Sequence, residues 1–156
     1  MNNCVCIPTA GIGSRLGSLK KGLNKSLINL GGKPVLSHII EKFNHDSEFI
    51  IPIGFGGNLV KEFIALAYPG YNIKFVDIDK FEGSGSGLGY TLKQTKEYLQ
   101  KPFYFISCDT LVIQEIPRLK YNWIGYSVKT DSNQYRTIKK DGNLVKCINK
   151  KNSVDA

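Results

Sequence analysis

Short apolar runs alternate with longer amphipathic segments along most of this chain. The runs are residues 5–8, 49–53, 73–78 and 103–107, and glycine or polar residues follow each of them. Apolar runs closed by turn residues are typical of buried strands, and the segments between them have the length and periodicity of helices. Strands that alternate with helices are joined by right-handed crossovers and form a mostly parallel sheet. The pattern therefore predicts an α/β fold.

Three helices are expected between the four strands. The first begins at Pro34, because proline suits the first helical turn and apolar residues then recur through Phe43. Asn58 can cap the second helix, which continues to Ala67. The third helix follows the glycine–serine stretch at residues 83–89.

The pattern changes after Pro117. Residues 123–128 and 135–138 have the composition of strands, and the Asp-Gly pair at 141–142 predicts a hairpin turn before residues 144–148. The chain has no internal repeat and no linker of distinct composition. We therefore expect a single domain over residues 1–156.

The composition fits such a domain, since 42% of the 156 residues are hydrophobic. No apolar run approaches the ~20 residues that a membrane helix needs, and the first residues lack a secretion signal. The four cysteines are too few and too unevenly spaced for a disulfide scaffold. We expect a cytoplasmic protein that is not bound to a membrane.

The net charge is +8, from 21 basic and 13 acidic residues. The basic residues are mostly lysines spread along the chain, and no nucleic-acid-binding motif accompanies them. We expect solvated lysines and no nucleic-acid partner, although the charge would attract small polyanions such as nucleotides.

A glycine loop follows the first strand. Gly11, Gly13 and Ser14 can present backbone N–H groups to a phosphate, and the Arg15 guanidinium can bind phosphate oxygens. The loop is not a Walker motif, and Leu16 stands where a dinucleotide-binding motif has its third glycine. A plain turn at the end of the strand is the alternative.

Two charged residues are candidates for the same site. Asp109 ends the fourth strand, where a carboxylate can hold Mg²⁺ against phosphates or can simply cap a turn. Lys25 can neutralise a phosphate or lie in solvent. Asp77 and Asp79 also lie at the end of a strand, and we expect them to be solvated loop residues.

The cysteines and histidines are expected to be structural. Cys4 and Cys6 share one face of a strand, and no other cysteine or histidine completes a metal site with them, so they should pack in the core. His38 and His45 lie on or just after a helix, with no nucleophile beside them in sequence.

The motifs occur in an order that resembles the sugar-phosphate nucleotidyltransferases. Residues 8–16 (PTAGIGSRL) are similar to the glycine loop of that family, and residues 31–36 (GGKPVL) to its Gly-Lys-Pro segment. Residues 24–27 (NKSL) resemble its Pro-Lys dipeptide, with Asn24 in place of the usual proline.

Later motifs extend the resemblance over roughly residues 5–112. Residues 53–57 and 83–87 resemble two further glycine segments, the second of which contacts the nucleotide in the family. Residues 102–111 (PFYFISCDTL) are similar to a Pro-Phe…Gly-Asp-x-Leu signature, with Cys108 in place of the glycine.

The resemblance implies a three-layer α/β sandwich with a mostly parallel, mixed sheet, a Rossmann-like nucleotide-binding half and a GT-A-like fold. Residues 1–112 would form the nucleotide-binding core. Residues 113–156 would begin an acceptor-binding part that is incomplete.

The resemblance also implies a Mg²⁺-dependent enzyme. It would move a nucleotide monophosphate from an NTP to a phosphorylated sugar or other small phosphorylated acceptor, with release of pyrophosphate. Arg15 and Lys25 would be catalytic, and Asp109 would bind Mg²⁺. The nucleotide-binding residues would be Ala10, Gly11, Gly13, Ser14, Arg15, Gly54, Gly85, Ser86 and Gly87.

Several alternatives stay open. CTP and UTP or dTTP are all candidate nucleotides, with a preference for CTP and for synthesis of capsule or other surface-glycan precursors. A non-catalytic nucleotide-binding module is one rival reading. A GT-A glycosyltransferase is the other, although residues 109–111 lack its Asp-x-Asp. A homo-oligomer also stays open.

A second metal ligand has no assignment in this sequence. The carboxylates after Asp109 are Glu115, Asp131, Asp141 and Asp155. We expect none of them to reach a metal at Asp109, and we expect an acceptor pocket that is open on one side and a slow transfer reaction.

Overall fold

The computed structural model describes residues 3–14, 16–17, 22–128 and 135–150. It divides into two compact units, Met1–Lys120 and Tyr121–Ala156. Arg15 and two of the downstream carboxylates, Asp131 and Asp155, lie outside the described residues. Among the described residues, no helix is long and apolar enough to cross a bilayer.

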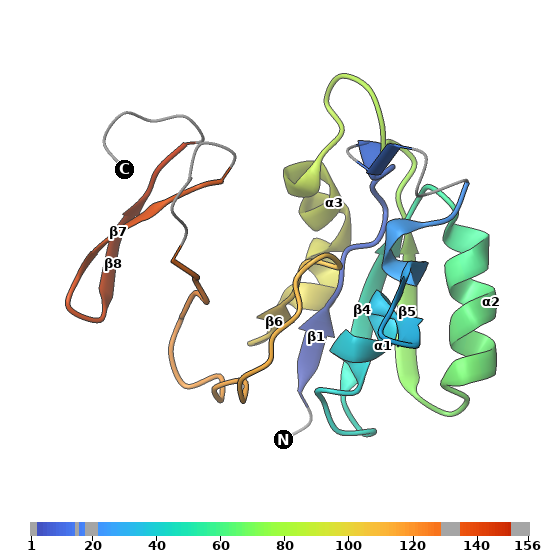
Figure 1. Ribbon diagram of the computed structural model, residues 1–156, viewed down its shortest axis with the longest axis horizontal. Coiled ribbons are helices and arrows are strands. Elements are labelled where there is room, and N and C mark those ends of the chain that lie inside the picture. The colour runs from blue at the N-terminus through green and yellow to red at the C-terminus, as the bar shows by residue number, and fades with distance from the viewer. Residues whose placement is uncertain (1–2, 15, 18–21, 129–134, 151–156) are drawn as a thin grey trace. The chain divides into compact units, whose positions relative to one another are not determined.

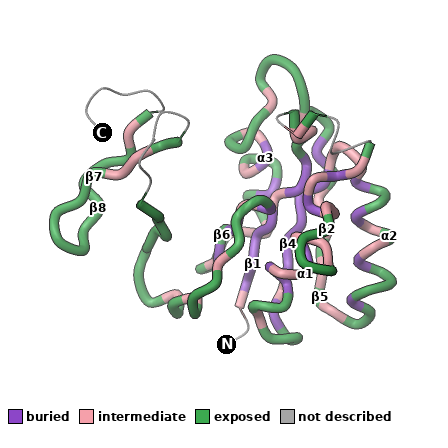
Figure 2. The backbone as a smooth tube through the Cα atoms, viewed as in Figure 1, coloured by how far each residue is buried: buried purple, intermediate pink, exposed green. Residues whose placement is uncertain are grey.

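The first unit is built on a four-stranded parallel sheet, as the pattern predicts. The strands are β1 (Cys4–Cys6), β4 (Glu48–Ile53), β5 (Asn72–Asp77) and β6 (Tyr104–Phe105). Their order across the sheet is β5-β4-β1-β6, and all three pairings are parallel. Residues of β1 and the five residues 49–53 of β4 are buried, which is why these strands read as continuous apolar runs (Figure 2).

Helices connect the strands. They are η2 (Lys25–Leu27), α1 (Val35–Ile40), α2 (Gly57–Ala67), α3 (Leu88–Thr95) and its continuation η3 (Lys96–Leu99). A small antiparallel pair, β2 (Asn29–Leu30) and β3 (Lys33–Pro34), precedes α1. The chain moves in one direction across the sheet from β1 to β5 and then returns to β6. Because crossovers are right-handed, α1 and α3 cover opposite faces (Figure 1). The α/β architecture is therefore confirmed.

The main core lies on the face that α1 and α2 cover. Phe49, Ile51 and Ile53 alternate along β4 and pack with buried residues of these two helices, among them Leu36 and Ile64. The α/β units thus bury their apolar faces locally, with the loops at the strand ends left accessible.

Cys4 and Cys6 are buried free cysteines, as expected. Burial raises the pKa of Cys6 to about 12, and it also raises the pKa of Cys4. Both thiols therefore stay protonated at neutral pH and behave as small core residues.

Two local predictions are wrong. The residue that caps α2 is Gly56, in the left-handed conformation with φ 63°, and Asn58 lies inside the helix. Glycine adopts this conformation without a steric penalty, so the chain enters the helix two residues earlier than a side-chain cap would allow. Residues 123–128 form no strand, and within the described part of their unit the backbone ladder joins β7 to β8 and does not include them.

The second unit contains the predicted hairpin. Strands β7 (Ile138–Asp141) and β8 (Leu144–Ile148) pair antiparallel around Gly142, whose φ is 55°. None of the residues described in this unit is buried (Figure 2). The hairpin therefore carries no core of its own among these residues.

Candidate functional site

The candidate site lies where the strand order reverses. From β1 the chain proceeds to β4 on one side, whereas β6 lies on the other side of β1. The carboxyl ends of β1 and β6 are therefore neighbours, and they lead into residues 9–14 and 107–109. In open α/β sheets, ligands bind in the crevice at such a reversal.

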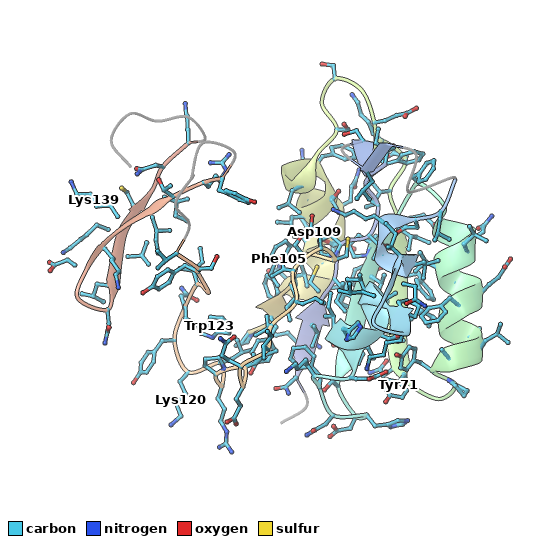
Figure 3. The ribbon with its side chains drawn as sticks, in the orientation of Figure 1. Tyr71, Phe105, Asp109, Lys120, Trp123 and Lys139 are labelled. Atoms are coloured by element: carbon cyan, nitrogen blue, oxygen red, sulfur yellow. The ribbon has the colours of Figure 1, made fainter. Side chains whose placement is uncertain are left out.

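Asp109 and Lys25, two predicted site residues, are brought together here. Lys25 Nζ donates to Asp109 Oδ2 at 2.8 Å, across 84 positions of sequence. The lysine side chain is 22% exposed and the aspartate side chain 47% exposed. The carboxylate is therefore partly open to solvent, so that a ligand can reach it. Figure 3 labels Asp109 among the side chains of the first unit.

Ser107 completes the surroundings of Asp109. Its Oγ donates to Asp109 Oδ1 at 2.6 Å. Burial by itself raises the pKa of Asp109, but the hydrogen bonds from Lys25 and Ser107 outweigh it and hold that pKa below its ordinary value. Asp109 is thus ionised at neutral pH. Sequence reasoning missed Ser107, whose hydroxyl is brought beside Asp109 by the turn that the Thr110 N–H closes on the Ser107 carbonyl at 3.0 Å.

The glycine loop approaches Lys25 closely. Gly13 has φ 63°, and a Cβ at this position would lie 3.4 Å from the Cβ of Lys25. The absence of a side chain at Gly13 lets the loop lie against the lysine. Gly11 and Ser14, by contrast, are exposed.

Gly54 joins the loop to the end of β4. A Cβ on Gly54 would lie 2.8 Å from the carbonyl oxygen of Ala10 and 2.9 Å from Phe81. Ala10 is buried, and its carbonyl accepts a hydrogen bond from the Phe55 N–H at 3.0 Å. Close packing between Ala10 and Gly54 therefore supports the loop from the protein interior. Neither residue presents a side chain to a ligand.

The second glycine loop, residues 83–89, follows β5. It therefore begins at the carboxyl ends of the strands, as the first glycine loop does. Gly85 and Gly87 have φ 81° and 135°, and Gly87 precedes α3. Ser86 donates from both its N–H and its Oγ to the carbonyl of Gly83, at 3.2 and 2.7 Å. This stretch is an exposed turn with its own internal bonds.

The other acidic residues have ordinary partners. Asp77 pairs with Lys61 at 3.3 Å, and Asp79 accepts a hydrogen bond from Tyr90 at 2.7 Å. Within the described ranges, no group of three or more histidine, cysteine, aspartate or glutamate side chains could hold a metal. The expectation that no later carboxylate reaches Asp109 stays a prediction.

The histidines have structural partners, as expected. His38 Nε2 lies 2.7 Å from the carbonyl oxygen of Leu30, and His45 packs edge-on against Tyr71. Neither ring lies in a contact with Lys25 or Asp109 that would indicate a nucleophile or base.

Comparison with known proteins gives two informative relatives by sequence. The chain is 25% identical over 137 residues to the D-glycero-α-D-manno-heptose 1-phosphate guanylyltransferase of Campylobacter jejuni, a match that covers 84% of this chain and 60% of that protein. It is 29% identical over 108 residues to the bifunctional protein GlmU of Methanococcus vannielii, covering 69% and 24%. No protein-family model matches the chain.

Among solved structures, the fold is similar to the CTP:phosphocholine cytidylyltransferase LicC of Streptococcus pneumoniae. The TM-score is 0.60 at 25% identity, and the match covers 78% of this chain and 51% of that one. The chain thus spans less than two thirds of each of these proteins.

Proposed function

Starting from the likeness of this chain to the sugar-phosphate nucleotidyltransferases, which its relatives confirm, we propose that it moves a nucleotide monophosphate from an NTP to a small phosphorylated acceptor. Pyrophosphate is the second product. The chain spans only part of its relatives, so the activity, substrates and partners of the whole protein belong to this proposal.

The observation that carries the proposal is the Lys25–Asp109 pair. It joins a cation and an ionised carboxylate at 2.8 Å, at the reversal of strand order, beside a glycine loop. Such a pair offers one group to a phosphate and one to a metal ion. A glycine turn that only ended β1 would not require a cation and a carboxylate beside it.

The reaction would be an in-line displacement. A phosphate oxygen of the acceptor attacks the α-phosphorus of the NTP, a new P–O bond forms, and the bond to the departing pyrophosphate breaks. Such transfers depend on positioning and on stabilisation of charge. Lys25 would neutralise the α-phosphate or the acceptor phosphate, while the N–H groups of Gly11, Gly13 and Ser14 hold phosphate oxygens. Arg15 would bind the departing pyrophosphate.

The donor set at Asp109 suits Mg²⁺. This ion favours oxygen ligands, often one or two carboxylates together with substrate phosphates and water. Asp109 has a half-exposed, ionised carboxylate whose present partners are a hydroxyl and an ammonium group. Asp109 would hold the ion, which would supply positive charge to the phosphates. Lys25, which lies beside Asp109, would offer its ammonium group to a phosphate oxygen.

The names of the relatives guide the choice of nucleotide and acceptor. Of the relatives, one is named for guanylyl transfer to a heptose 1-phosphate and another for cytidylyl transfer to phosphocholine. We propose CTP as the first candidate, then UTP or dTTP, and surface-glycan precursor synthesis as the role. The loop of Gly85, Ser86 and Gly87, together with Gly54, would bind the nucleotide.

The test is a matrix of NTPs and acceptors. Each of CTP, UTP, dTTP and GTP is incubated with Mg²⁺ and with phosphocholine or a sugar 1-phosphate, and pyrophosphate release is measured. We expect release that needs both substrates. Tight NTP binding without release would favour the non-catalytic module, and sugar transfer from a nucleotide sugar would favour the glycosyltransferase.

A matched pair of lysine variants controls the test. Lys25→Met should slow release strongly but leave a measurable residual rate, whereas Lys101→Met, which removes a lysine that pairs with Glu48 at the start of β4, away from the site, should leave release unchanged. Equal activity in the two variants would contradict the role proposed for Lys25.

A further inference from the structure

We propose that Asn24 is a positioning residue for Lys25. Its buried side chain fastens the segment that carries the lysine to the ends of two strands. Where the proposal concerns turnover, it rests on the function proposed above; where it concerns the placement of Lys25, it rests on geometry alone.

The Asn24 side chain uses both its ends. It is fully buried, with 0% exposure. Its Nδ2 donates to the carbonyl of Thr9 at 2.8 Å and to the carbonyl of Phe55 at 2.6 Å. Its Oδ1 accepts from the N–H and the Oγ of Ser26, at 3.0 and 2.8 Å. Four hydrogen bonds therefore satisfy one amide group completely.

These bonds connect three elements of the site. Thr9 follows β1, Phe55 follows β4, and Ser26 lies in η2, whose first residue is Lys25. The buried Thr9 is itself held, since its Oγ1 and its N–H both donate to the carbonyl of Pro52. The Asn24 amide thus holds the segment that carries Lys25 against the residues that follow β1 and β4.

The backbone at Asn24 explains what the side chain adds. Its φ is −64° and its ψ is 136°. Proline, which the resemblance places at this position in related proteins, fixes φ near about −65°. Asparagine leaves φ free in the unfolded chain, so its side chain must supply the restraint that the ring would give. As N-cap of η2, it does so through the Ser26 N–H.

Lys25 depends on this restraint because its side chain is long and flexible. The Nζ reaches Asp109 only if η2 holds the Cα in place beside Gly13. An unfastened η2 would let the lysine sample other positions. Misplacement of a catalytic group by about an ångström can slow a reaction roughly a hundredfold.

The first experiment measures the placement of Lys25 without any substrate. The free chain is acetylated with an amine-reactive ester, and mass spectrometry follows each lysine with time. In wild type, Lys25 should react slowly because its ammonium group is paired and only 22% exposed. In Asn24→Ala, we expect Lys25 to react several-fold faster. An unchanged rate in the folded variant would overturn the proposal.

A matched control removes a buried hydrogen bond elsewhere. Thr95 is fully buried in α3, and its Oγ1 donates to the carbonyls of Thr91 and Leu92. Thr95→Val should lower stability without changing the reaction of Lys25. If Asn24→Ala does not fold, Ser26→Ala removes one of the four bonds more gently. Faster reaction of Lys25 in that variant supports the proposal, and an equal rate overturns it.

The second experiment is a double-mutant cycle on turnover. Asn24→Ala should lower kcat by between about tenfold and a hundredfold, with a smaller change in KM for the NTP. In a Lys25→Ala background the same change should have almost no further effect, within about twofold. An equal loss in both backgrounds would mean that Asn24 supports the fold and not the lysine, and would overturn the proposal.

The two experiments separate two kinds of failure. A wild-type chain that releases no pyrophosphate would contradict the proposed function, while the acetylation rates still decide the role of Asn24. Normal turnover with unchanged Lys25 reactivity in Asn24→Ala would contradict only the role of Asn24.

Discussion

At the scale of single residues, Asp109 is the most informative position. Asp109→Asn keeps the shape and removes the charge, so Mg²⁺-dependent NTP binding should weaken. The melting temperature without metal should barely move, because a pair this exposed contributes only about 0–1 kcal/mol. Calorimetric titration of NTP with and without Mg²⁺ measures the first effect. A variant that melts at a clearly lower temperature but binds NTP with an unchanged dependence on Mg²⁺ would show that Asp109 only caps a turn.

Glu41 gives a prediction about pH. A hydrogen bond from Lys33 lowers the pKa of Glu41; burial opposes that shift, and a hydrogen bond from Tyr68 adds to it. A carboxylate with a lowered pKa stabilises the fold above its ordinary pKa, and this stability is lost as the pH falls through the lowered value. We therefore expect wild type to exceed Glu41→Gln in free energy of unfolding at neutral pH.

The size of the Glu41 effect is limited by solvent. The side chain is 44% exposed, so the difference should not exceed about 1 kcal/mol. Urea unfolding at neutral pH and near roughly pH 3 should show the difference closing on acidification. A difference that stays constant between the two pH values would contradict the assignment of the lowered pKa to this residue.

At the scale of elements, the joint between the glycine loop and β4 can be tested at Gly54. A methyl group there would lie 2.8 Å from a backbone oxygen, that of Ala10, so the loop or the strand end must shift. Gly54→Ala should lower the free energy of unfolding by about 1–3 kcal/mol and weaken NTP binding. Gly11→Ala is the control for stability, because nothing lies within 4 Å of its new methyl group. Equal denaturation midpoints in the two variants would contradict the close packing at Gly54.

The elements that the sequence predicts well are those whose partners are local. The buried strand β4 and the partly exposed strand β5 both read as apolar runs, and α2 reads as an amphipathic helix, because each is packed within its own βαβ unit. The site could also be predicted in outline, since the carboxyl ends of parallel strands gather at one edge. The order of motifs then pointed to Lys25 and Asp109, which the structure brings together.

The parts that sequence reasoning missed depend on distant partners. The anchoring role of Asn24 needs Thr9 and Phe55, which are 15 and 31 positions away, and no local pattern marks such a contact. Residues 123–128 show the opposite error. Their aromatic and β-branched composition suits a strand, but strand preference depends on context, and no backbone ladder in the described part of the second unit includes them.

At the scale of the whole molecule, the two units differ in what stabilises them. The buried core residues lie between Cys4 and Cys108, all within the first unit. In the second unit, the β7–β8 hairpin exposes Leu144, Val145 and Ile148. An isolated two-stranded hairpin is at best marginally stable in water. The folding free energy of the chain therefore resides in the first unit.

This difference predicts the outcome of a truncation. A chain that ends at Lys120 keeps every described core residue and both members of the Lys25–Asp109 pair. We expect it to unfold cooperatively, with a denaturation midpoint close to that of the full chain, and to bind NTP with Mg²⁺. If residues 113–156 contribute to acceptor binding, it should also lose acceptor-dependent release of pyrophosphate. Thermal unfolding, NTP titration and the release assay on the two chains measure the three effects. A truncated chain that cannot fold would place essential core contacts in the second unit, and one with full transfer activity would remove that unit from the acceptor site.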